Sequence, residues 1–204
     1  MPEWGLCSPP RVDRALLQQS AATVAPQLLG LYLVHETAEG RTVGRIVETE
    51  AYSQDDPAAH THRGETRRNR AMFGPAGHAY IYQMHGHHCV NCTAGQIGYG
   101  SGCLLRALEP VAGLDLMRLR RGAQDERALC SGPGKLAKAM GITMDQYGLD
   151  LLDADSPLRL EPPQTEADFE TVQTTRIGIS RAQEVQWRFY IQGNAHLSRK
   201  RVGT

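Results

Sequence analysis

Two strand-like runs follow each other closely in the first quarter of the sequence. LYLVHE (31–36) and RTVGRIVETEAY (41–52) are rich in β-branched and aromatic residues, and only residues 37–40 separate them. Four residues suffice for a hairpin but not for the long crossover that joins parallel strands. The pair therefore predicts an antiparallel sheet, which constrains the rest of the fold.

Further strand-like runs lie at 79–84, 88–94, 103–108, 174–180 and 187–193, and helical patterns at 20–30, 111–122 and 133–142. Pro26 predicts that the first helix is short or kinked. Because strands and helices do not alternate, a doubly wound parallel sheet is disfavoured. The sequence predicts an α+β fold in a single domain, residues 1–204, with a mostly antiparallel curved sheet, surrounding helices and a loose leader at 1–12.

Residues 53–78 are polar and contain glycine and proline, which predicts a long loop. A loop of this length in a compact domain usually carries function. Charge is also distributed unevenly, although the formal net charge is +0. Residues 60–122 hold eight arginines and three acidic residues, whereas residues 145–170 hold eight acidic residues and one arginine. The basic stretch is compatible with binding to nucleic acid.

Five cysteines are present: Cys7, Cys89, Cys92, Cys103 and Cys130. Their odd number, in a chain of 204 residues that needs no covalent staples, favours reduced thiols. The N-terminal sequence lacks the pattern of a signal peptide, and no apolar run could span a bilayer. We therefore expect a cytoplasmic protein, nucleoid-associated if bacterial, with no membrane contact.

The run HGHHCVNC collects side chains of the types that bind zinc: His85, His87, His88, Cys89 and Cys92, with His60 and His62 upstream. On a strand, however, successive side chains point to opposite faces, so these residues cannot all converge on one ion. A metal-binding protein is therefore kept only as a less favoured alternative, and neither a metal nor a cofactor is expected.

Several short blocks follow one another along the chain: RIVETEAY at 45–52, AAH at 58–60, RNRAMF at 68–73, LLRALEP at 104–110, CSGPGKL at 130–136 and RFYIQGN at 188–194. In this order the set resembles the 3-methyladenine (alkyladenine) DNA glycosylase family, from about residue 28 to residue 198. The resemblance implies a monomeric enzyme without metal or cofactor. It would remove alkylated or deaminated purines, such as 3-methyladenine, hypoxanthine and ethenoadenine, from double-stranded DNA and leave an abasic site.

Hydrolysis of an N-glycosidic bond requires a carboxylate that activates water beside an oxocarbenium-like sugar. Alternation along the strand places Glu48 and Glu50 on one face and Thr49 on the other, so the pattern alone does not choose between the two acids. The resemblance implies that Glu50 is catalytic. Arg106, inside the apolar run CLLRAL, needs a partner if it is buried, and the resemblance makes it the second catalytic residue.

A flipped base needs a slot with stacking faces and groups that read its edge. By resemblance, Tyr52, His60 and Tyr82 contact the faces of the purine, and Asn91 excludes guanine by clashing with its exocyclic amine. The DNA wedge is expected at His85, where the family usually has tyrosine, and the segment from Gly86 to Asn91 looks one residue short. Flipping is therefore expected to be weaker or pH-dependent.

Contacts with the DNA backbone are expected from Arg68, Asn69 and Arg70, and from Ser131 and Lys135 at a helix start. None of the three lysines, Lys135, Lys138 and Lys200, lies in a pocket motif, so hydrolysis without Schiff-base lyase chemistry is favoured. The altered wedge keeps one further alternative open, a catalytically weak relative that only binds damaged DNA.

Overall fold

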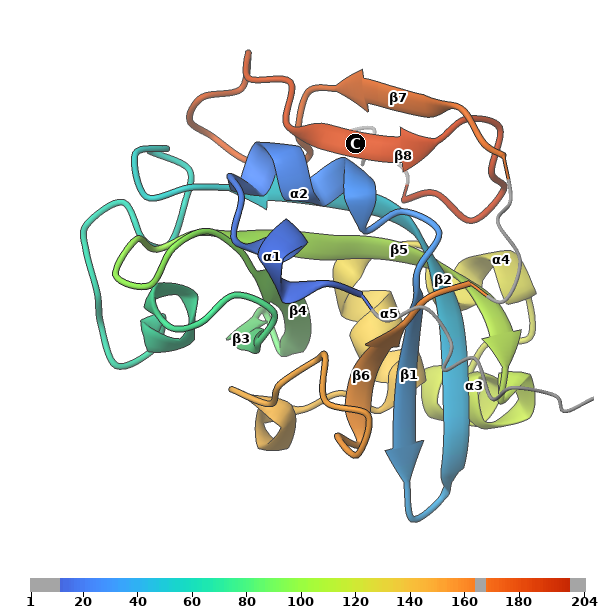
Figure 1. Cartoon of the computed structure of the whole chain (residues 1–204). Coiled ribbons are helices and arrows are strands. Elements are labelled where there is room, and N and C mark those ends of the chain that lie inside the picture. Colours follow the sequence, from blue (N-terminus) through green and yellow to red (C-terminus); the bar gives the residue numbers. More distant parts are fainter. Residues whose placement is uncertain (1–11, 164–167, 199–204) are drawn as a thin grey trace, which may run out of the picture.

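The computed structural model describes residues 12–163 and 168–198, which form an α+β fold around one curled antiparallel sheet (Figure 1), as predicted. All of the expected leader except Val12 lies outside the described residues. The strands are β1 (Tyr32–Thr37), β2 (Gly40–Tyr52), β3 (Ala79–Met84), β4 (His87–Thr93), β5 (Gly102–Ala112), β6 (Leu158–Glu161), β7 (Thr171–Thr174) and β8 (Arg188–Ile191).

Strand β2 is the long central element of the sheet. Its first half pairs with β1, its second half with β8, and its other edge with β5 along most of its length. The main strand order is β3-β4-β5-β2-β1-β6, and β7 pairs with β8. Register shifts against β5 around Glu48 bend the strand, which is how bulges curve a sheet.

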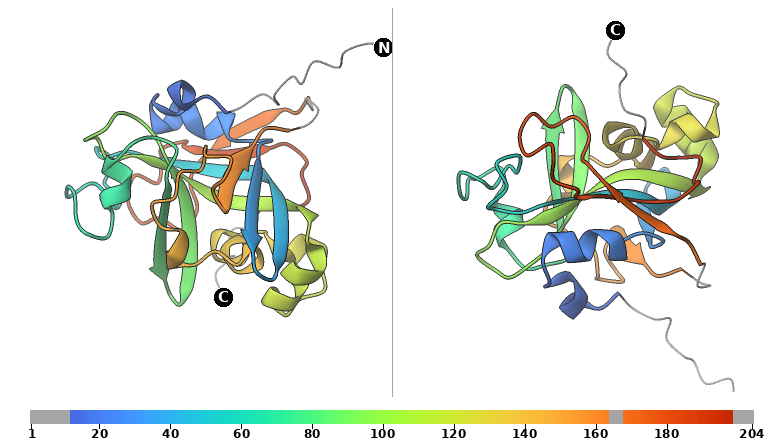
Figure 2. Two further views of the ribbon diagram at one scale, coloured as in Figure 1. Left: turned by 60° about the horizontal axis from the view of Figure 1, so that its bottom comes forward. Right: turned by 90° about the horizontal axis from the view of Figure 1, so that it is seen from above.

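The helices are α1 (Arg14–Leu17), α2 (Ala21–Gln27), α3 (Leu114–Arg121), α4 (Glu126–Leu129) and α5 (Pro133–Met140), with 3-10 turns η1 (Arg70–Phe73) and η2 (Met144–Gln146). Ser20 caps α2 by accepting from the Thr23 N–H, and Pro26 lies in its last turn. Figure 2 shows α1 and α2 apart from α3–α5, which gather elsewhere around the sheet. Helix α2 packs against β2, and α5 packs against β4 and β5.

Buried apolar side chains form two clusters. The larger one lies between the sheet and the helices. The smaller one consists of Met72, Phe73, Tyr80, Tyr82, Cys89 and Leu104. It joins the loop at 53–78 to strands β3, β4 and β5, and therefore gives this long loop a fixed position beside the sheet.

Two expected elements differ from the structure. The strand expected at 174–180 is wrong, because β7 ends at Thr174 and the following residues leave the sheet to make side-chain and backbone contacts elsewhere. The helix expected at 111–122 begins only at Leu114, since β5 continues to Ala112 and Gly113 turns the chain with φ of 75°. Helices α1 and α4, of four residues each, were not expected from the pattern.

Candidate active site

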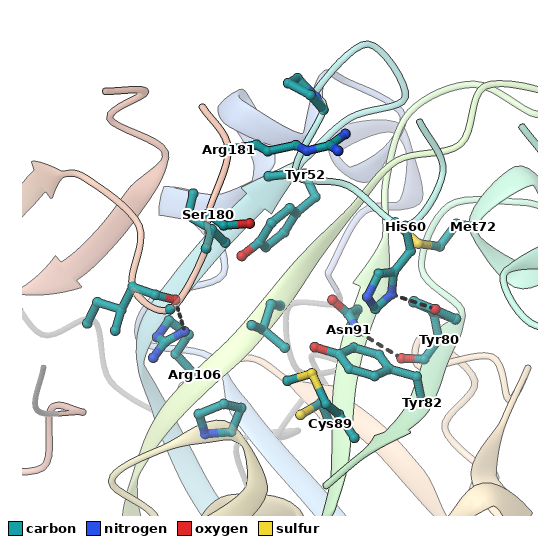
Figure 3. Close-up of a pocket in the computed structure, with 18 residues that line it drawn as sticks. Tyr52, His60, Met72, Tyr80, Tyr82, Cys89, Asn91, Arg106, Ser180 and Arg181 are labelled. Atoms are coloured by element: carbon teal, nitrogen blue, oxygen red, sulfur yellow. Dashed lines mark hydrogen bonds between the residues drawn. The ribbon is translucent and has the colours of Figure 1, made fainter. Parts of the chain in front are cut away.

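A cavity of about 340 Å³ opens beside the end of β2 (Figure 3). Four parts of the chain line most of it: the end of β2 with the following loop, the β3–β4 hairpin with its cluster, strand β5, and residues 177–181. Pro133 at the start of α5 completes the lining. The expected residues Tyr52, His60, Tyr82, Asn91 and Arg106 all line this one cavity. Such a volume falls in the range of pockets that enclose small organic molecules.

The Glu50 carboxylate lies fully buried behind the cavity wall and accepts three hydrogen bonds. The Tyr52 hydroxyl donates to Oε2 at 2.9 Å, Arg106 Nη1 donates to the same oxygen at 3.1 Å, and the Ile177 N–H donates to Oε1 at 2.7 Å. All three donor residues, Tyr52, Arg106 and Ile177, also line the cavity. Glu50 is thus joined directly to groups that a bound molecule would touch.

Glu48 lies on the same face of β2 but is bonded differently. It accepts from Arg106 Nε at 3.3 Å, Arg188 Nε at 2.6 Å, the Ser198 N–H at 2.6 Å and the Ser198 hydroxyl at 2.7 Å. A carboxylate has about four acceptor positions, so within the described part of the chain Glu48 is saturated whereas Glu50 keeps one position. Thr49 points the other way and donates to the Ala25 carbonyl of α2. The expected alternation along β2 is confirmed.

Tyr52 supplies both a ring and a proton donor to the site. Burial raises the pKa of its phenol well above the usual value, and the neighbouring Glu50 carboxylate raises it further. The hydroxyl therefore stays protonated at neutral pH. It acts as the donor in its hydrogen bond with Glu50, and the carboxylate acts as the acceptor. The same negative charge that this bond stabilises is the charge that a hydrolytic base must carry.

His60 and Tyr82 form an aromatic corner at the opposite side of the cavity. Their rings meet edge to face, with centroids 4.5 Å apart, and His60 Nδ1 lies 2.9 Å from the Tyr80 hydroxyl. Although His60 stands at the mouth, partial burial of its ring lowers its pKa, and the positive charge of Arg68 lowers it further. Burial raises the pKa of Tyr80 to about 12, so this corner carries no charge at pH 7.

Asn91 lies buried on β4, where its Nδ2 donates to the Tyr80 carbonyl at 3.1 Å. This bond across the β3–β4 pair fixes the amide in one orientation. A fixed amide beside aromatic rings can read the edge of a planar ligand, since only one pattern of donors and acceptors fits it.

His85 and Gly86 make the two-residue turn between β3 and β4. Both have positive φ, 50° and 77°, as a tight hairpin requires, and His85 is exposed. Met84, the residue before the turn, lines the cavity. The hairpin therefore holds the His85 side chain at its tip, one residue beyond the cavity wall.

The residues expected at the DNA backbone fall into two classes. Arg68, Arg70 and Lys135 are exposed, and Arg68 donates to the Gln83 carbonyl at 3.1 Å beside the cavity. Asn69 is buried, and its amide already bonds Thr66 N–H and the carbonyls of His60 and Gly64. Its side chain holds the loop together, and both amide N–H groups are used inside the loop.

Ser131 and Lys135 lie together around the start of α5, with Lys135 Nζ 3.4 Å from the Ser131 hydroxyl. Pro133, between them, lines the cavity. This turn therefore stands on the cavity rim, where a polar backbone passing the mouth would meet it.

Residues 177–181 form a wall of the cavity that sequence reasoning missed. Ile177 contacts both expected catalytic residues, through its N–H to Glu50 and through its carbonyl, which accepts from Arg106 Nη1 at 3.5 Å. Arg181 lies above Tyr52 in Figure 3. The run TTRIGIS resembled a closing strand, and only the arginine inside it signalled another role.

The zinc-type side chains do not form a cluster. Cys89 belongs to the smaller apolar cluster and Cys92 to the larger one, while His85 and His87 are exposed at the hairpin. Within residues 12–163 and 168–198, no three histidine, cysteine or acidic residues come together in a way that could hold a metal ion. In the same part of the chain, no helix has the length and apolar character needed to cross a membrane.

Comparison with known proteins gives a consistent result. The family model for methylpurine-DNA glycosylase matches residues 15–195. Similar curated proteins, each provisionally named a 3-methyladenine DNA glycosylase, occur in Methanoculleus marisnigri (52% identical, covering 91% of this chain and 97% of the relative) and Nitrosospira multiformis (47%, 94% and 94%). A third, from Carboxydothermus hydrogenoformans, is 43% identical over 93% of this chain and 99% of its own length.

Proposed function

Because the chain belongs to the methylpurine-DNA glycosylase family and is a DNA glycosylase, we propose that it excises alkylated and deaminated purines from double-stranded DNA. The substrate class is that of 3-methyladenine, hypoxanthine and ethenoadenine. The protein acts as a monomer, needs no cofactor, and leaves an abasic site. Its substrate, and the four free buried thiols among the described residues, favour a place in the cytoplasm beside the chromosome.

The damaged base is flipped out of the duplex and enters the cavity beside β2. Tyr52 and the corner of His60 and Tyr82 supply the faces against which it stacks, and Asn91 reads its edge and excludes guanine. His85 at the hairpin tip fills the space that the base leaves. Arg68, Arg70, Ser131 and Lys135 hold the backbone at the cavity rim.

The observation that carries the proposal is the contact of Glu50 with Arg106 and Tyr52 at the cavity wall. A water bound by Glu50 and Arg106 attacks the anomeric carbon of the sugar. The bond from that carbon to the base nitrogen breaks, its electron pair leaves with the base, and the water proton passes to Glu50. The negative charge of Glu50 also stabilises the developing oxocarbenium ion.

Hydrolysis by water is favoured over lyase chemistry, because a lyase needs an amine that can form a Schiff base with the sugar. Among the residues that the structure describes, those that line the cavity include no lysine. Lys135 lies at the start of α5 and Lys138 in its last turn, and Lys200 lies outside the described residues.

The test is single-turnover excision from duplex oligonucleotides that carry ethenoadenine, hypoxanthine or no lesion. Wild type should release the damaged base and leave an alkali-labile site, and Glu50→Gln should abolish release while the duplex still binds. Glu36→Gln, which changes an exposed carboxylate on β1, is the matched control and should act as wild type. A wild type that releases no base from these duplexes or from alkylated DNA would contradict the proposal.

A further inference from the structure

Arg176 is a buried arginine directly behind the active site, and it joins three segments of the chain. Its guanidinium forms a bidentate pair with Asp56, through Nη1 to Oδ2 and Nη2 to Oδ1. It also donates to the Ala51 carbonyl of β2 at 3.0 Å and to the Ala182 carbonyl at 3.4 Å. Both side chains of the pair are almost completely buried.

The same guanidinium packs over two aromatic rings. Its central carbon is 4.7 Å from the centre of the Tyr52 ring and 5.5 Å from that of Trp187. The Tyr52 ring is therefore supported from behind by a cation held in a fixed plane, and its hydroxyl points to Glu50. A planar, bidentate guanidinium can do this, whereas a lysine ammonium cannot.

Arg176 also precedes Ile177, whose peptide groups contact both Glu50 and Arg106. Anchoring Arg176 fixes where the following N–H and carbonyl lie. Two of the three donors to Glu50, the Tyr52 hydroxyl and the Ile177 N–H, are thus placed through Arg176. Neither Arg176 nor Asp56 lines the cavity itself.

Stability alone does not explain such a pair. A buried ion pair is often no more stabilising than apolar residues of the same volume. Moreover, Arg176 Nε is buried without a hydrogen-bond partner in the part of the chain that the structure describes, and an unsatisfied buried donor costs about 1–3 kcal/mol. The arrangement is unfavourable as packing but well suited to fixing geometry.

We propose that Arg176 and Asp56 form a positioning pair for the hydrolytic site, which sets the Tyr52 hydroxyl and the Ile177 N–H against Glu50. This inference rests on the proposed function, in which Glu50 activates water. Arg176 does not touch the reacting atoms and is not a catalytic residue. Its loss should misplace the donors to Glu50 and lower the rate of bond breaking, while the cavity rim that holds DNA stays intact.

The experiment compares Arg176→Met, Arg176→Lys and Asp56→Asn with wild type in single-turnover excision and in DNA affinity. Arg120→Met is the matched control, because Arg120 also joins separate segments, through Glu39, Thr37 and the Ala139 carbonyl, but lies away from the cavity. Arg176→Met should lower the excision rate by about 100-fold, as misplacement by an ångström does, with unchanged DNA affinity. Arg120→Met should lower the melting temperature only.

Asp56→Asn keeps the shape of the pair and tests the idea even if Arg176→Met fails to fold. Asp56→Asn should also lower the excision rate. Arg176→Lys should not restore the wild-type rate. Amide exchange provides a readout that does not depend on activity. The Ile177 N–H should lose protection in the Arg176 and Asp56 variants and keep it in Arg120→Met.

The two proposals fail in different ways. If wild type excises damaged bases but Asp56→Asn and the folded Arg176 variants excise at the wild-type rate, the positioning pair is refuted and the proposed function stands. Retained protection of the Ile177 N–H in these variants refutes it equally. If wild type excises nothing, the proposed function fails, and the positioning role falls with it.

Discussion

Glu48 and Glu50 lie on one face of β2, and the guanidinium of Arg106 lies between their carboxylates. Arg106 donates through Nε to Glu48 and through Nη1 to Glu50. The first acid is saturated by donors from two arginines and Ser198, and the second is bonded to groups of the cavity wall. One strand therefore carries two buried acids with different partners, and mutation can test whether their tasks also differ.

Glu48→Gln should reduce stability more than activity. A glutamine cannot accept all four hydrogen bonds. It removes the charge that pairs with Arg188 and leaves Arg106 with Glu50 alone, and breaking a buried pair in this way costs about 3–5 kcal/mol. Glu50 and its contacts with Tyr52 and Ile177 remain, so slow excision should persist. Urea unfolding and single-turnover excision of Glu48→Gln and Glu50→Gln provide the comparison. If Glu48→Gln removes excision completely in a folded protein, the assignment of tasks is wrong.

Tyr52→Phe should lower the excision rate without weakening DNA binding. The ring that faces the cavity is kept, but Glu50 loses a donor, and a hydrogen bond to a charged group contributes about 1.5–3 kcal/mol. Rates and affinities on an ethenoadenine duplex are the measurement. Tyr82→Phe is the control, since Tyr82 donates no hydrogen bond to Glu50 among the bonds of the described residues. Equal rates for the two variants would contradict the expectation.

His60 should make excision depend on pH in a way that differs between bases. Its pKa is lowered by burial and by Arg68, so the folded protein keeps the ring neutral at pH 7. As the pH falls below 6.5, His60 is protonated in the unfolded chain before it is protonated in the folded protein. The contribution of His60 to the free energy of unfolding is therefore lost as the pH falls through this range. Once protonated in the cavity, the ring repels a cationic base such as 3-methyladenine but not neutral ethenoadenine.

The measurement is the ratio of excision rates for a cationic and a neutral base between pH 5 and pH 8. A titration that acts on hydrolysis itself changes both rates together and leaves the ratio unchanged. In wild type the ratio should fall as the pH drops through the His60 pKa, and in His60→Gln it should stay level. A ratio that falls equally in both proteins would exclude His60 as the cause.

His85→Ala should slow excision from a fully paired duplex more than from a duplex in which the lesion faces a mismatch. A wedge offsets the cost of unpairing and unstacking, and that cost is smaller where the pair is already weak. The two duplexes are compared at pH 6 and pH 8, with His62→Ala, an exposed histidine of the neighbouring loop, as control. Unchanged rate and affinity at both pH values would remove His85 from the wedge position.

One part of the site could be predicted from sequence alone, from the alternation of side chains along a strand. Alternation on β2 places Glu48 and Glu50 on one side and Thr49 on the other, and the apolar context of Arg106 predicts that it needs an acidic partner. Both expectations are confirmed. The choice of Glu50 as the catalytic acid came from the family resemblance, because both acids have the same local pattern.

The other part of the site depends on partners that lie far apart in the sequence. Arg176 pairs with Asp56, 120 residues earlier, and this contact takes the run TTRIGIS out of the sheet that its β-branched residues suggested. Asn69 stands among arginines and so resembled a phosphate contact, but its amide satisfies neighbouring backbone groups of the loop. The local sequence pattern around Arg176 or Asn69 does not indicate these partners.

Two donors to the acids of β2 are synthesised long after the strand itself. Ile177 follows Glu50 by 127 residues and Ser198 follows Glu48 by 150. A growing chain already carries both acids, Arg106 and the aromatic wall long before those residues leave the ribosome. Until they dock, the acids lack the contacts that fix their geometry. We therefore expect the ability to cut the glycosidic bond to appear only when the fold closes, which would protect the chromosome from an unfinished chain.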